Sequence, residues 1–200
     1  DALARIRETI RPAVERAREH AAELFLRLEA LVLAANDGVV RLEPDFTTEP
    51  EWTERLAPVY ENLTIALDAL VRELGRLRDL IQLDTRWAEA LEERLLELQG
   101  ASARVVASLD ALRLAFSPGD DAMPLVRWLE RRGGGEGREA NVVVNAAPVD
   151  VSGALSEALF ERVDTAVLTS ATLATRDGFT FLKERLGIGR GGVKLRESVH

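Results

Sequence analysis

The segment that decides the fold predicted for the second half of the chain is Ala166-Val167-Leu168-Thr169-Ser170-Ala171-Thr172-Leu173. It joins an apolar run, typical of a buried strand, to a cluster of small hydroxyl-bearing residues. In open α/β sheets, ligands bind in the crevice at the carboxyl ends of the strands. The segment therefore predicts a strand over 165–169 whose carboxyl end opens onto a ligand-binding crevice.

Two further strands are predicted before this run. Alternating or β-branched residues over 125–130 and 141–146 are typical of strands. The glycine cluster Gly133-Gly134-Gly135-Glu136-Gly137 lies between them. A phosphate-binding loop would follow a strand and open a helix. The cluster therefore predicts a flexible hairpin loop instead.

Two short helices are expected on either side of the opening run. Ser152 is the candidate N-cap of the first, and the second runs from 177 to Gly187, followed by a strand-like run at 193–195. The buried face of the first helix is expected to comprise Leu155, Leu159, Phe160 and Val163. The order strand, helix, strand, helix, strand is typical of a parallel α/β sheet.

Three long amphipathic helices are predicted in the first half of the chain. Apolar residues recur at steps of three and four over 1–36, 48–83 and 84–112, which places them on one face of each helix. Helices of this length are about 40 Å long, and short connections favour antiparallel packing. A short strand or an extended loop is expected at 39–42.

Local signals mark the ends of these helices. Asn36-Asp37-Gly38 is expected to end the first helix, because Asn and Gly tolerate the left-handed conformation. Thr48 is expected to cap the second helix, and Asp84 or Thr85 the third.

The predicted fold class is therefore mixed. An elongated antiparallel α-helical bundle over 1–118 is followed by part of an α/β domain over 119–200, with the boundary at Ser117-Pro118-Gly119. The chain begins at Asp1 without methionine and stops at His200 just after a strand-like run. We therefore expect it to be an internal piece of a longer protein.

Composition excludes several functions. The 200 residues include no cysteine and two histidines, which excludes disulfides and gives no means to build a zinc site. No apolar run approaches the roughly 20 residues that span a bilayer, and no signal peptide opens the chain. We expect a soluble, cytoplasmic protein without membrane contact.

Charge is distributed unevenly along the chain. The formal net charge is −8; residues 1–116 contain 15 Arg and 22 Asp or Glu, a net charge of −7. Nonspecific nucleic-acid binding depends on Lys and Arg that neutralise phosphates. The predicted bundle therefore lacks a broad basic surface, and any DNA contact there must be local.

Catalytic motifs are also absent from the sequence. There is no glycine-rich loop followed by Lys-Ser or Lys-Thr, no acidic pair at a strand end to bind magnesium, and no supported Ser/His/Asp triad. We therefore expect no catalytic residue, no metal site and no ATP hydrolysis in this chain alone.

The opening segment nevertheless resembles a helicase motif. Thr169-Ser170-Ala171-Thr172-Leu173 resembles motif III of superfamily 2 helicases, in the form typical of the bacterial DinG branch of the DinG/XPD helicases. Residues 147–152, with Leu155 and Leu159-Phe160, resemble the segment before motif III in that family. Phe179-x-Phe181-Leu182, with Arg185-Leu186-Gly187, resembles the segment after it.

This resemblance implies a position in the parent helicase. Residues 1–118 would form the helical arch insertion, and 119–200 the C-terminal part of the first RecA-like domain. The Walker A loop and the acidic box would lie before Asp1, and the second motor domain after His200. The parent would bind ATP and magnesium, hydrolyse ATP, unwind DNA by translocating on single strands, and act in DNA repair. The resemblance leaves open whether the parent carries an iron–sulfur cluster.

The resemblance also implies roles for the motif residues. Ser170 and Thr172 would hydrogen-bond to the acidic box, Thr169 would support them, and Ala171 would allow close approach, so that ATP hydrolysis is coupled to movement on DNA. Alternatively, Ser170 and Thr172 satisfy backbone groups at a strand end.

A second interpretation of the whole chain stays open. Acidic, leucine-striped helices also fit a non-catalytic helical-bundle module that binds a protein partner. In either case, a sheet without its neighbouring strands exposes edges that favour self-association.

Overall fold

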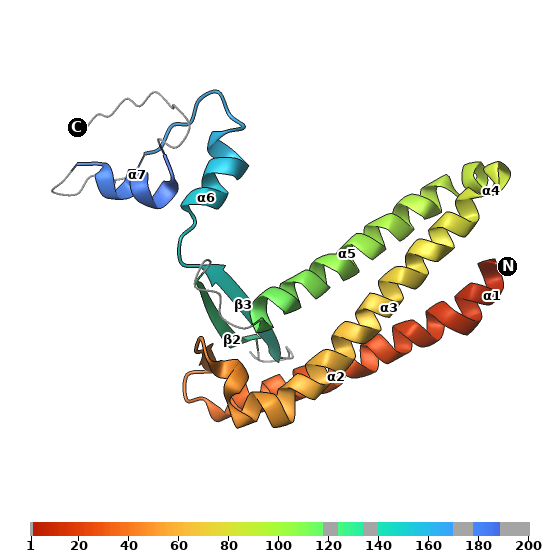
Figure 1. Cartoon of the computed structure of the whole chain (residues 1–200), viewed down its shortest axis with the longest axis horizontal. Helices are drawn as coiled ribbons and strands as arrows, with labels where there is room; N and C mark the ends of the chain where they lie inside the picture. The colour runs from red at the N-terminus through yellow and green to blue at the C-terminus, as the bar shows by residue number, and fades with distance from the viewer. Residues whose placement is uncertain (1, 118–123, 134–139, 170–177, 189–200) are drawn as a thin grey trace. The chain divides into compact units, whose positions relative to one another are not determined.

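The computed structural model describes residues 2–117, 124–133, 140–169 and 178–188. It contains two compact units (Figure 1). Unit 1 comprises Asp1–Gly119 with Val126–Ala146, and unit 2 comprises Asp120–Leu125 with Ala147–His200. The strand-forming residues 126–146 therefore group with the helices, whereas the assignment of 1–118 to an arch and 119–200 to a RecA-like domain stays a prediction.

Long helices dominate unit 1, as predicted. Helix α1 (Ala2–Arg5) continues through a π-helical turn (Ile6–Ile10) into α2 (Arg11–Ala34). A second π-helical turn (Glu51–Leu56) leads into α3 (Ala57–Gln82). Helix α4 (Thr85–Ala90) and α5 (Glu92–Phe116) complete the bundle. Helix α3 packs against both α2 and α5 as the chain runs back and forth (Figure 1).

Two of the predicted helix ends are confirmed. Helix α2 ends at Ala34, and Gly38 adopts a φ of 70° before the chain turns into a strand. The Asp84 carboxylate accepts a hydrogen bond from the amide of Arg86 at 3.0 Å and caps α4.

The predicted cap at Thr48 is wrong. Thr48 lies in a 3-10 turn (Phe46–Thr48), and its hydroxyl donates to the carbonyl oxygen of Asp45 at 2.8 Å. Pro50 already has helical φ and ψ, and the π-helical turn follows from Glu51. The amides of Trp52 and Thr53 donate instead to the carbonyl oxygen of Glu49, at 3.0 and 2.9 Å, so a backbone group takes the place expected for the Thr48 hydroxyl.

Apolar stripes from the three helices meet in two clusters. The larger cluster contains Leu24, Leu28, Val32 and Leu63. It also contains three aromatic rings: the ring centroids of Phe46 and Trp52 are 5.1 Å apart, and those of Trp52 and Phe116 are 5.3 Å apart. The smaller cluster consists of Ile10, Ala13, Ala17, Leu70 and Leu77. Each fully buried large side chain contributes about 1.5–3 kcal/mol relative to exposure.

A three-stranded sheet packs against the larger cluster. Its order is β1 (Val39–Leu42), β2 (Leu125–Gly133) and β3 (Ala140–Pro148). Strands β1 and β2 are antiparallel, with Val39 opposite Glu130 and Leu42 opposite Arg127. The strand alternative at 39–42 and the strands predicted at 125–130 and 141–146 are thus confirmed.

Strands β2 and β3 are neighbours in the sheet, as the hairpin predicted between them requires, whereas the parallel arrangement was predicted for 141–146 with 165–169 and 193–195. Only residues 134–139 join β2 to β3, and the amide of Val149 donates to the carbonyl of Pro124 at 2.9 Å, so the two strands form an antiparallel hairpin. Parallel neighbours need a crossover of a dozen or more residues. The predicted hairpin connection is confirmed, although the residues of the loop itself lie outside the described part of the chain.

Buried contacts fasten the hairpin to the helices. Leu129 is fully buried and Val142 nearly so, both within the cluster that contains Leu24 and Leu28. Arg127, also buried, donates from Nε to the carbonyl of Leu114 at the end of α5, at 3.4 Å. These contacts explain why the hairpin belongs to the helical unit.

In unit 2, the strand predicted at 165–169 is not observed. These residues form no strand and are exposed, Val167 to 83% and Leu168 to 43%. Strand backbone groups must hydrogen-bond to a neighbouring strand, and no strand pairing among the described residues includes this run. The RecA-like arrangement therefore stays a prediction.

Candidate functional site

The structure describes one residue of the predicted motif III. Thr169 is exposed and lies in the irregular segment that follows Val167 and Leu168. Ser170, Ala171 and Thr172 lie outside the described residues. Their proposed role in coupling is therefore still a prediction.

The two segments that flank motif III meet in unit 2. Helix α6 (Ser152–Leu155), extended by a π-helical turn (Ser156–Phe160), packs against α7 (Thr180–Leu186). Gly187 ends α7 as predicted, with a left-handed φ of 69°. A Cβ at Gly187 would collide with the backbone carbonyl of Ser152. A glycine here is required twice, by its conformation and by the close approach of the two flanks.

Ser152 differs from its predicted role. It is the first residue of α6 rather than the N-cap, and its amide donates to the Asp150 carboxylate at 2.8 Å. The Asp150 side chain thus takes the position expected for a capping hydroxyl. The Ser152 hydroxyl is buried without a hydrogen-bond partner among the described residues, a feature that sequence reasoning missed.

Most arginines of the bundle are held in ion pairs. Arg113 of α5 pairs with Asp68 of α3 at 2.6 Å, and Arg5 of α1 pairs with Glu73 of α3 at 2.5 Å. Burial opposes the ionisation of Glu73, but hydrogen bonds from Arg5 and Arg76 outweigh it and lower the pKa of Glu73 below its usual value. Arg113 and Arg5 therefore connect helices through their ion pairs.

A local basic tract lies in the first helices of the bundle. Residues 2–18 contain five Arg and two Glu, a net charge of +3 in a bundle that is acidic as a whole. Arg7, Arg11 and Arg18 are exposed and form no ion pair with any described residue. Their spacing of four and seven residues repeats on one side of a helix. Sequence reasoning missed this tract because it summed charge over 1–116.

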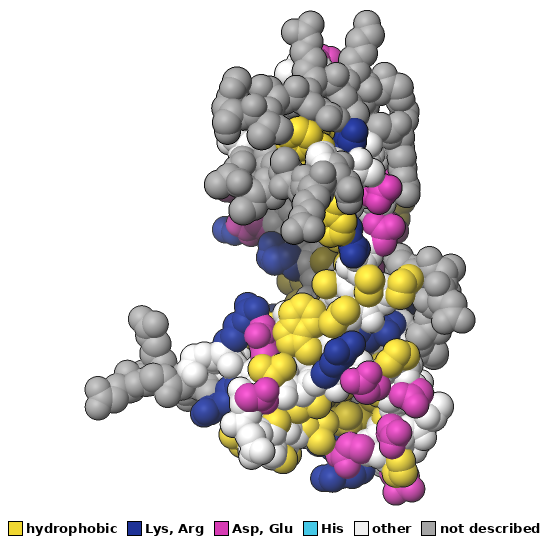
Figure 2. All heavy atoms as spheres, turned by 90° about the vertical axis from the view of Figure 1, so that its left-hand side faces the viewer, with side chains coloured by type: hydrophobic (Ala, Val, Ile, Leu, Met, Phe, Trp, Pro, Cys, Tyr) yellow, Lys and Arg dark blue, Asp and Glu magenta, His cyan; other side chains and the backbone are white. Residues whose placement is uncertain are grey.

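Other surfaces of the molecule are mixed in charge. On the face shown in Figure 2, basic and acidic side chains are interspersed among hydrophobic ones. No group of three or more His, Asp or Glu within the described ranges could hold a metal ion. Likewise, no helix in these ranges is both long and apolar enough to cross a membrane.

Comparison with known proteins finds sequence similarity to a DNA helicase. No family model matches it. The relative is the ATP-dependent DNA helicase DinG of Photobacterium profundum, to which the chain is 28% identical over 159 residues, or 77% of its length. This similarity confirms the resemblance to DinG helicases predicted from motif III and its flanks. The chain spans 22% of the length of that relative.

Proposed function

We propose that the chain is part of a DinG-like, ATP-dependent DNA helicase. In this proposal 1–118 form the arch-like insertion and 119–200 the C-terminal part of the first RecA-like domain. The observation that carries the proposal is the similarity to DinG over 77% of the chain. The parent would use ATP and magnesium to translocate on single-stranded DNA in the cytoplasm.

In this proposal Thr169, Ser170, Ala171 and Thr172 couple hydrolysis to movement. The close packing of α6 on α7 supports it, because it brings the two flanks of the motif into one unit. The test is Ser170→Ala with Thr172→Ala in the full-length helicase, with ATPase and unwinding assayed side by side. We expect retained ATPase and lost unwinding; Thr165→Ala, outside the motif, is the matched control. Wild-type unwinding by the double variant would rule out a coupling role.

The isolated chain should not hydrolyse ATP. It contains no phosphate-binding loop and no acidic pair for magnesium in its sequence. A phosphate-release assay on the purified 200-residue chain tests this expectation directly. Turnover above that of a buffer blank would contradict the assignment of this chain to a part without the ATP-binding motifs.

The basic tract at Arg7, Arg11 and Arg18 is the proposed DNA contact of the helical unit. Exposed guanidinium groups without carboxylate partners can neutralise phosphates. Replacing all three by Gln should reduce the slope of log affinity for single-stranded DNA against log salt by about 2, at about 0.7 per lost contact. The control is Gln at Arg55, which already pairs with Glu51 at 3.1 Å. An unchanged slope would exclude this tract from the DNA path.

The second candidate is a protein-interaction module without motor function. Exposed apolar side chains on the helices and in the α3–α4 turn favour it, including Leu26, Leu83 and Trp87, with exposed fractions of 68%, 83% and 59%. The discriminating observation is the coding sequence before Asp1. A Walker A loop there supports the helicase, whereas a start codon immediately before Asp1 supports the module.

A further inference from the structure

Helix α2 has a second apolar face besides the one in the core. The core-facing residues Leu24, Leu28 and Val32 are buried. On another side, Ala22, Leu26 and Leu33 recur at helical spacing, with Leu26 exposed to 68% and Leu33 to 59%. Phe25 lies beside them and packs partly against the larger cluster. The outer side of a surface helix is normally polar. Clustered apolar side chains at such a position mark an interaction surface.

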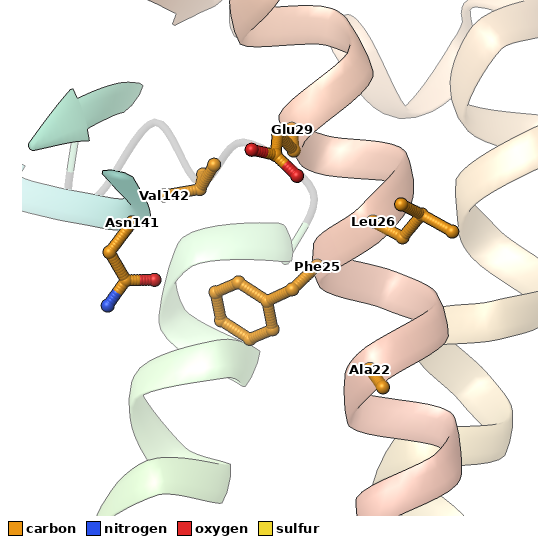
Figure 3. A pocket seen from close by; sticks show the side chains of 6 residues that line it. All are labelled: Ala22, Phe25, Leu26, Glu29, Asn141 and Val142. Carbon is orange, nitrogen blue, oxygen red and sulfur yellow. The ribbon is translucent and has the colours of Figure 1, made fainter. Parts of the chain in front are cut away.

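This face borders a hollow between α2 and β3. The hollow has a volume of about 250 Å³. Figure 3 shows Phe25 and Glu29 reaching from α2 toward the strand that carries Asn141 and Val142. We call this hollow the α2–β3 groove; its lining is Ala22, Phe25, Leu26, Glu29, Asn141 and Val142.

Glu29 is the one charged group among the described residues of that lining. It is partly buried and forms no ion pair with any residue in the described ranges. Its neighbours one turn away on α2 are Phe25, Leu26 and Leu33, none of which offers a cation. A carboxylate among apolar groups gains most from a charged donor that completes its hydrogen bonds.

We propose that the α2–β3 groove docks a segment of a separate protein that carries an Arg or Lys side chain between apolar residues. The cation pairs with Glu29, and the apolar side chains cover Phe25, Leu26 and Val142. The net charge of −7 over 1–116 attracts a basic segment over longer range. A nucleic acid or an anionic membrane does not fit, because the described residues of the lining include a carboxylate and no basic group.

Benzamidine is the probe for this groove, because it combines an apolar ring with a cation of the guanidinium type. The experiment is a titration of the isotope-labelled 200-residue chain followed by amide NMR shifts. We expect saturable shifts confined to the lining of α2 and β3. Benzamide, which has the same shape without the charge, should bind about tenfold more weakly, as expected for loss of a charged hydrogen bond.

Variants then assign the binding to particular side chains. Glu29→Gln should weaken benzamidine about tenfold and abolish its preference over benzamide. Glu15→Gln, the same change at an exposed position of α2 outside the lining, should change nothing. Leu26→Gln should weaken both probes; since Leu26 is largely exposed, this variant keeps the fold.

Three outcomes would overturn the proposal. Equal affinity for benzamidine and benzamide would show that the groove does not select a cationic side chain. Amide shifts spread over the whole surface, or no shifts at all, would show that the α2–β3 groove is not a binding site. Shifts at the lining that depend on protein concentration without any probe would show that a second copy of this chain occupies the groove instead.

Discussion

The helical bundle and the run at 165–169 were both predicted from apolar patterns in the sequence. The apolar face of the bundle is buried, whereas the run at 165–169 is exposed. Leu24, Leu28 and Leu63 are buried in the core of unit 1. Val167 and Leu168 of the other run are exposed in unit 2. The difference lies in what each element needs to become stable. A helix satisfies its backbone within itself and needs only one packing partner, whereas a strand needs a neighbour for every backbone group it buries.

Truncation of the core should show the largest effect. Leu28→Ala should lower the free energy of unfolding by about 2–5 kcal/mol, because it removes a fully buried side chain from the larger cluster. Urea denaturation followed by circular dichroism measures the change. Leu26→Ala, on the exposed side of the same helix, should change stability by less than about 0.5 kcal/mol. Equal losses of unfolding free energy in the two variants would show that Leu26 and Leu28 do not differ in burial.

A smaller loss is expected at the helix end in unit 2. Gly187→Ala should destabilise the α6–α7 contact by more than about 1 kcal/mol, since the residue has a positive φ and no room for a Cβ. Hydrogen exchange should speed up in α6 and α7 and stay unchanged in α2 and α3. Unaltered protection in α7 would show that the close approach to Ser152 does not persist in solution.

Acid should weaken the contact between α1 and α3. Because its partners lower the pKa of Glu73, this carboxylate stabilises the fold above the usual Glu pKa, and that contribution is lost as pH falls through the lowered value. Comparing Glu73→Gln with the unaltered chain across that acidic range measures it. We expect a stability difference at neutral pH that shrinks in acid. A difference independent of pH would assign the effect to packing rather than to charge.

The smallest effect is expected in the exposed run itself. Val167→Asp should change stability by no more than about 0.5 kcal/mol, because the side chain is 83% exposed. Thr165→Ala is a neutral control in the same segment. A loss comparable to that of Leu28→Ala would show that this run is buried as a strand in solution, and would restore the original prediction.

Sequence reasoning succeeded where local rules are sufficient. The three helical regions, the stop at Gly38, the cap at Asp84 and the end at Gly187 all follow from periodicity or from one residue's conformational preference. It failed at Thr48 and Ser152. The carbonyl of Glu49 accepts from the amides that Thr48 was expected to cap, and the Asp150 carboxylate accepts from the amide of Ser152.

The candidate site divides in the same way. The family resemblance was predicted from motif III and its flanks, and the similarity to DinG confirmed it. The basic tract at Arg7, Arg11 and Arg18 was present in the spacing but hidden by the acidic total. The α2–β3 groove was not predictable, because Glu29 and Asn141 are 112 positions apart and only packing brings them to one lining.

By itself, the sequence determined the helices, the short strands and the resemblance to a DinG helicase, because these depend on residues close together in the chain. Only the tertiary structure decided that β1 pairs antiparallel with β2, that the hairpin joins the helical unit, and that 165–169 is exposed. Strand pairing and burial depend on which distant segments supply partners, and that information is spread over the whole chain.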